Sequence, residues 1–122
     1  MRNSLRFYNH PQDRCAPVAM INLDDKNTAY HIQTFLTGDV QTENSCSEWI
    51  DRISEAKNNP DYFYEIFVNC CTTKITHSQM SIENEYLELD TLPKEMMLDD
   101  MQIILEKWRE YLQTSQELEY SW

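Results

Sequence analysis

Four cysteines and three histidines are the side chains of this sequence best suited to nucleophilic or metal chemistry. They are Cys15, Cys46, Cys70, Cys71, His10, His31 and His77. No two cysteines have the Cys-x-x-Cys spacing and no two histidines are four residues apart, so their pattern does not predict a zinc site. A thiol enzyme would pair Cys70 or Cys71 with His77 across a hairpin, and would need an exposed thiol of lowered pKa.

Adjacent cysteines point to opposite faces when they lie in a strand, which separates the thiols of Cys70 and Cys71 in that arrangement. Free cysteine is also among the most frequently buried residues. We therefore expect reduced, mostly buried thiols, together with histidines that are structural or lie on the surface. A redox or metal role of the cysteines remains an alternative, as does the thiol enzyme.

Carboxylates are abundant, but their spacing indicates no particular reaction. With 21 acidic residues, some pair lies close in any fold, so proximity alone does not indicate acid–base catalysis. The pairs Asp24-Asp25 and Asp99-Asp100 lack the Asp-x-Asp-x-Asp-Gly frame of a calcium loop. The single glycine, Gly38, excludes the dinucleotide and P-loop motifs, which need more than one. We predict no catalytic residue, no metal site and no cofactor.

Acidic charge is concentrated toward the C-terminus. Residues 81–122 contain eleven acids and three bases, so they carry −8 of the total charge of −11. Such a surface repels nucleic acid and attracts basic protein surfaces. It either keeps the protein soluble or binds a cationic partner, and the clustering favours the partner. The candidate partner-binding residues are Glu83, Glu85, Tyr86, Glu88, Asp90 and Glu95, with the tyrosine included because tyrosine is enriched at binding hot spots.

Length and composition predict one folded domain spanning residues 1–122. The chain is 41% hydrophobic and 11% aromatic, which is enough for a single core. No apolar stretch approaches the roughly 18 to 20 residues of a membrane span, and the first ten residues lack the apolar run of a secretory signal. The expected location is the cytoplasm.

Two segments have the three- and four-residue spacing of apolar side chains that indicates an amphipathic helix. In residues 44–58 the apolar stripe comprises Cys46, Trp49, Ile50, Ile53 and Ala56. Ser45 and Glu48 have the spacing of a capping box at its start, and Pro60 follows its end. In residues 97–114 the stripe comprises Leu98, Met101, Ile104, Leu105, Trp108, Tyr111 and Leu112.

Four segments are predicted to be strands. Residues 28–37 alternate apolar and polar side chains, and residues 62–71 are apolar at nearly every position, which predicts a central strand covered on both faces. Residues 73–82 alternate with a slip that could be a bulge, and residues 86–90 alternate briefly. Residues 1–27 and 115–122 show no clear period.

Together these elements predict an α+β fold, in which an antiparallel meander of three or more strands packs against two amphipathic helices.

The meander, a Leu-Pro pair and the last helix form a pattern across residues 62–112. The residues that carry it are Leu92, Pro93, Leu98, Ile104, Leu105, Trp108, Tyr111 and Leu112. This pattern, which covers less than half of the chain, resembles the C-terminal half of bacterial immunity proteins from contact-dependent growth inhibition and related polymorphic toxin systems. The resemblance implies a pre-folded acidic inhibitor that binds a cognate toxin domain, a basic nuclease, and occupies its nucleic-acid surface. It implies no direct contact with nucleic acid or membrane, and no enzyme activity.

An acidic secretion chaperone, or another protein-binding adaptor, is the alternative binding protein. Type III chaperones are similarly small, acidic and mixed in structure. They usually begin with a long amphipathic helix, whereas Pro11 and Pro17 interrupt the start of this chain.

Overall fold

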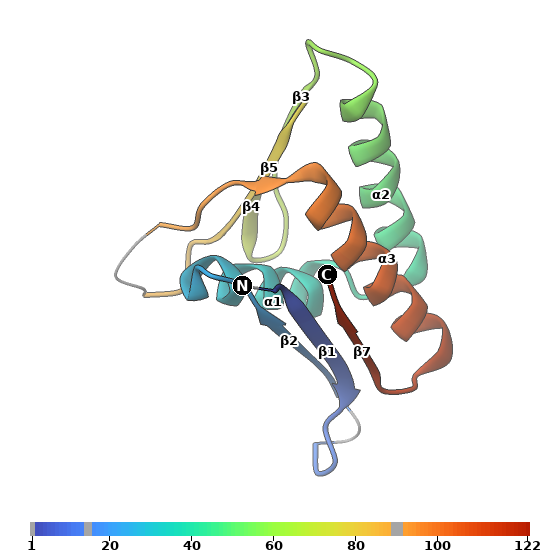
Figure 1. The fold of residues 1–122 in the computed structure, drawn as a ribbon. Helices are drawn as coiled ribbons and strands as arrows, with labels where there is room; N and C mark the ends of the chain where they lie inside the picture. Colours follow the sequence, from blue (N-terminus) through green and yellow to red (C-terminus); the bar gives the residue numbers. More distant parts are fainter. Residues whose placement is uncertain (1, 14–15, 89–91) are drawn as a thin grey trace.

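The computed structural model describes residues 2–13, 16–88 and 92–122, and in these residues the chain forms three helices and two antiparallel sheets (Figure 1). The smaller sheet has the order β2-β1-β7 and comprises β1 (Ser4–Asn9), β2 (Pro17–Asn22) and β7 (Leu118–Ser121). The larger sheet has the order β3-β4-β5-β6 and comprises β3 (Phe63–Phe67), β4 (Cys71–Thr76), β5 (Gln79–Asn84) and β6 (Met96–Met97). The predicted α+β class and antiparallel meander are confirmed, and the smaller sheet is an addition to them.

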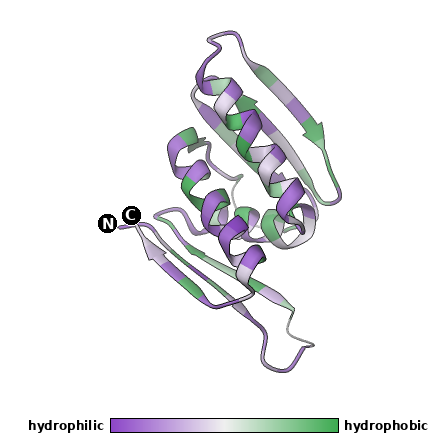
Figure 2. Cartoon of the chain, turned by 90° about the vertical axis from the view of Figure 1, so that its right-hand side faces the viewer, coloured by the Kyte–Doolittle hydropathy of each residue, from purple (hydrophilic) through white to green (hydrophobic). Residues whose placement is uncertain are grey.

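The helices are α1 (Lys26–Asp39), α2 (Glu43–Lys57) and α3 (Leu98–Thr114). α1 runs between the two sheets and packs against β2 and β5, while α2 and α3 pack on each other (Figure 1). Hydrophobic and hydrophilic residues alternate along α2 and α3 (Figure 2), as expected for the two amphipathic helices, which are confirmed. None of the helices in the described part of the chain has the length and apolar character needed to cross a membrane.

Trp108 of α3 joins several parts of the core. Its ring centroid lies 4.9 Å from that of Phe7 in β1 and 5.3 Å from that of Tyr111. Its indole Nε1 donates a 2.7 Å hydrogen bond to the backbone oxygen of Val40, directly after α1. The one side chain therefore fixes α3 against both the smaller sheet and the end of α1.

The strand predicted at residues 28–37 is wrong, because this segment lies in α1. Asp25 caps the helix, since its Oδ1 accepts a 2.9 Å hydrogen bond from the backbone N–H of Thr28. The buried face includes Thr28 and His31 as well as apolar residues. Thr28 Oγ1 accepts from the backbone N–H of Lys94, and His31 Nδ1 accepts from that of Asn84, each at 2.8 Å. Because polar residues occupy part of the buried face of α1, its apolar residues alone do not show the three- and four-residue spacing of a helix.

The prediction that residues 62–71 form the centre of the sheet is also wrong. β3 covers only Phe63–Phe67 and lies at the edge, with Phe63 65% exposed and Phe67 51% exposed. The hairpin closes with the hydrogen bond from Val68 N–H to the backbone oxygen of Cys71, so Cys70 lies in the turn. Tyr64, on the other face, packs against Trp49 of α2 at 6.2 Å between ring centroids.

The slip predicted as a bulge within residues 73–82 is a hairpin turn. β4 ends at Thr76 and β5 begins at Gln79, with His77 and Ser78 between them. The strand predicted at 86–90 is absent from its described part, residues 86–88, and the rest lies outside the described residues. Asn84 forms a turn there instead, because its Oδ1 accepts a hydrogen bond of 2.9 Å from the backbone N–H of Tyr86.

The predicted start of α2 needs a correction, whereas α3 ends at Thr114 as predicted. The N-cap of α2 is Thr42, whose Oγ1 accepts a 3.0 Å hydrogen bond from the backbone N–H of Ser45, in place of the predicted box of Ser45 and Glu48. After α3, Ser115 adopts the left-handed conformation, with φ of 56°, and reverses the chain. The following residues form β7 beside β1, because Leu118 pairs with Phe7 and supplies the next apolar side chain of the sheet.

Candidate functional site

The larger sheet has one face packed on the helices and one face that no helix covers in the described part of the chain. Buried side chains such as Ile75, Met80 and Ile82 point to the helices. The alternate residues form the uncovered face, here named the open sheet face. By strand register it comprises Phe63, Glu65, Phe67, Thr72, Lys74, Thr76, Gln79, Ser81, Glu83 and Met97.

Strand register aligns an aromatic and an acidic side chain across this face. Phe67 of β3 pairs with Thr72 of β4, and Thr72 pairs with Glu83 of β5, so the three form one row. Glu85 lies beside the row, since its Oε1 accepts a hydrogen bond of 3.0 Å from Thr72 Oγ1. One end of the open sheet face is therefore acidic and has an exposed phenylalanine at its edge.

The predicted partner-binding residues are only partly brought together. Glu83 lies on the open sheet face, and Glu85 lies beside it. Tyr86 is 73% exposed in the turn that follows β5, and Glu88 is exposed further along the chain. Glu95 is exposed directly before β6, and Asp90 lies outside the described residues.

Sequence reasoning missed the apolar part of this face. Phe63, Phe67 and Met97 are each more than half exposed, although the first two were predicted to be buried in a central strand. Glu65, placed between the two phenylalanines at the spacing of alternate strand residues, was the signal that this face meets water.

The outer edge of β3 has no neighbouring strand in the described chain. Val68 and Cys71 form a hydrogen-bonded pair, and hydrogen-bonded and non-bonded pairs alternate along antiparallel strands. The backbone groups of Phe63, Glu65 and Phe67 consequently point away from β4. A short edge with an acidic residue at its centre disfavours pairing with a second β3, since two like charges would meet.

The described cysteines do not form a pair with His77. Cys71 begins β4 and His77 follows its end, a separation of about 20 Å at the rise of a strand. His77 Nδ1 instead lies 2.8 Å from the backbone oxygen of Ala56. Cys46 donates to the backbone oxygen of Leu105, and burial raises the pKa of its thiol to about 12. Burial also raises the pKa of Cys70.

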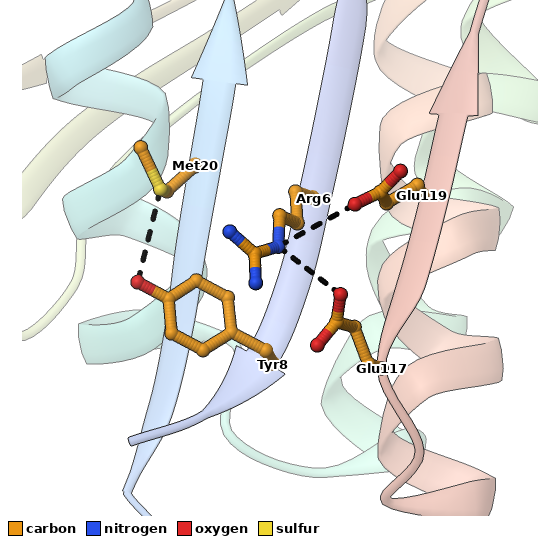
Figure 3. Close-up of polar contacts among 5 residues, drawn as sticks. All are labelled: Arg6, Tyr8, Met20, Glu117 and Glu119. Carbon is orange, nitrogen blue, oxygen red and sulfur yellow. Dashed lines mark hydrogen bonds and ion pairs between the residues drawn. The ribbon is translucent and has the colours of Figure 1, made fainter. Parts of the chain in front are cut away.

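A cleft of about 580 Å³ lies where the smaller sheet meets α1. Arg6, on its wall, is 3.2 Å from Glu117 and 3.6 Å from Glu119 and lies over the ring of Tyr8 (Figure 3). Glu117 raises the pKa of the guanidinium, which is already paired. The described lining residues include neither cysteine nor histidine.

No family model, curated protein or solved structure matches the chain.

Proposed function

We propose that this protein is a bacterial immunity protein, which binds a cognate toxin domain and neutralises it without being an enzyme. The observation that supports this function best is the open sheet face, where Glu83 and the exposed Phe67 lie in one row with Glu85 beside it. Exposed aromatic side chains are typical anchors of protein interfaces, and charged groups at the rim set the partner. The predicted residues Glu85, Tyr86 and Glu88 extend this surface beyond β5.

Charge complementarity favours a nuclease as the toxin domain. Nucleases bind the phosphate backbone through clustered lysine and arginine side chains. A chain with net charge −11 is attracted to such a cluster over long range, which raises the association rate. Once bound, carboxylates such as Glu83 and Glu85 occupy the positions of phosphates and exclude the substrate. The inhibitor acts in the cytoplasm, where a delivered nuclease meets nucleic acid.

The test begins with the gene immediately upstream, which we expect to encode the toxin domain, and uses that domain as the binding partner. We expect an equimolar complex that abolishes nucleic-acid cleavage, with an affinity that falls as salt rises because surface charges are screened. Glu85→Lys combined with Glu88→Lys should weaken binding by about tenfold or more. Glu48→Lys combined with Glu55→Lys, two exposed changes on α2 with the same total change of charge, is the matched control and should bind nearly as wild type.

If the Glu85→Lys, Glu88→Lys variant and the Glu48→Lys, Glu55→Lys control bind with equal affinity, the acidic binding surface is refuted. If the gene for this protein instead lies beside a secretion operon, and the protein binds an unfolded secretion substrate, the function is that of a secretion chaperone.

A further inference from the structure

The C-terminal end of α1 meets the β3–β4 turn at three possible metal ligands. A carboxylate oxygen of Asp39 and the Sγ atoms of Cys70 and Cys71 all lie within 4.8 Å of one another. The two sulfur atoms are 3.4 Å apart and are not joined in a disulfide. They reach the same side because Cys70 lies in the turn while Cys71 begins β4, contrary to the opposite-face arrangement expected for one continuous strand.

Asp39 is a buried carboxylate with an unmet oxygen. It is 7% exposed; Oδ1 accepts a hydrogen bond of 3.2 Å from the backbone N–H of Cys70, whereas Oδ2 has no partner among the described residues. The last turn of α1 contains no basic residue, and the carbonyl end of a helix adds negative potential. A buried anion in such a field is costly unless a cation neutralises it.

The only glycine of the sequence makes room for this cluster. A Cβ atom on Gly38 would lie 3.0 Å from Cys70 Sγ, closer than side chains normally pack. Gly38 does not have a positive φ, so the backbone itself does not require glycine there. Asn69 Nδ2 also donates to the backbone oxygen of Gly38 at 3.3 Å, which holds the turn against the helix.

We propose that Asp39, Cys70 and Cys71 bind one thiophilic divalent cation, Zn²⁺ being the best fit to two sulfur ligands and one oxygen. Tetrahedral Zn²⁺ with bonds of about 2.3 Å separates its sulfur ligands by about 3.8 Å, so the two thiols need to move apart by only a few tenths of an ångström. Cys70 is partly exposed and leaves a path for the ion and a fourth, solvent ligand. Binding replaces the two thiol protons with the metal, because thiols coordinate as thiolates.

Such an ion ties the end of α1 to the hairpin that carries β3. It therefore stabilises the edge of the larger sheet, and this role does not depend on the identity of any protein partner.

The experiment titrates the reduced, metal-free full-length protein with Co²⁺ and then with Zn²⁺. We expect a thiolate-to-cobalt charge-transfer absorption that saturates at one equivalent and disappears when Zn²⁺ displaces Co²⁺, together with a higher melting temperature. Cys70→Ser should abolish this absorption. Asp39→Asn should weaken Co²⁺ binding by about tenfold or more, because the loss of even a group that only supports a metal ligand typically weakens binding by that factor. Cys46→Ser, which removes a buried thiol elsewhere, is the matched control and should bind like wild type.

Circular dichroism first establishes that each variant is folded. The proposal is overturned if the wild type shows no saturable absorption at one equivalent, or if folded Cys70→Ser binds Co²⁺ as tightly as Cys46→Ser does.

Discussion

Replacing His31 tests whether a buried neutral imidazole joins α1 to β5. His31 is 3% exposed, and its Nδ1 accepts a 2.8 Å hydrogen bond from the backbone N–H of Asn84. Burial lowers the pKa of this imidazole, while the charges of Glu83 and Asp25 act in the opposite direction. Because Nδ1 accepts this hydrogen bond, the folded protein holds His31 in its neutral form.

The lowered pKa determines how stability depends on pH. The unfolded chain, in which histidine has a pKa of about 6.5, binds the proton first as the pH falls. The stabilisation from neutral His31 is therefore present above about pH 6.5 and is lost as the pH falls toward the folded pKa. Between about pH 7.5 and about pH 5.5, this loss of unfolding free energy reaches at most about 1.4 kcal/mol, the value of one pKa unit.

Two variants separate titration from hydrogen bonding. His31→Asn places an amide oxygen near the position of Nδ1 and cannot titrate, whereas His31→Leu leaves the N–H of Asn84 buried without an acceptor. Urea unfolding should show His31→Leu less stable than His31→Asn by about 2 kcal/mol at both pH values. The wild type should lose up to about 1.4 kcal/mol more than His31→Asn between the two pH values. Equal losses in wild type and His31→Asn would refute the reasoning.

Four further substitutions test three other parts of the structure. Phe67→Ser should change the unfolding free energy by less than about 0.5 kcal/mol. Calorimetry of the complex should show toxin binding weakened by about 2 kcal/mol, because the exposed ring on the open sheet face is lost. Binding equal to that of wild type would contradict the role of Phe67 in the interface. Thr42→Ala should cost about 1 kcal/mol in urea unfolding and Glu48→Ala almost nothing, and the reverse order would restore the Ser45-based capping box. Trp108→Phe should cost about 2 kcal/mol or more, because the backbone oxygen of Val40 loses its buried donor, and a near-neutral change would contradict that role.

Helices α2 and α3 were predictable because apolar residues fill nearly every inward position of each. α1 was not, since Thr28 and His31 occupy inward positions and meet their hydrogen-bond partners only in the folded protein. Their partners lie 66 and 53 residues away, respectively, and no local spacing indicates that these polar groups are satisfied.

The strands show a second physical limit. The sequence around an apolar residue such as Phe63 is the same whether its side chain lies under a helix or on an open face. Residues 62–71 were therefore predicted to form a central strand. Which face is covered depends on how the helices pack. The acidic part of the candidate site was predictable from charge spacing, whereas Asp39 and Cys70 meet across 31 positions of sequence.

Pairing β1 with β7 joins opposite ends of the sequence, since Arg6 and Glu117 are 111 positions apart. Closing so long a loop has a high entropic cost, whereas the β1–β2 hairpin and the meander form through local contacts. β7 therefore docks late during folding, and until it docks, β1 is a free edge of a two-stranded ribbon. An intermediate with that edge unpaired is the state of this chain most exposed to intermolecular strand pairing.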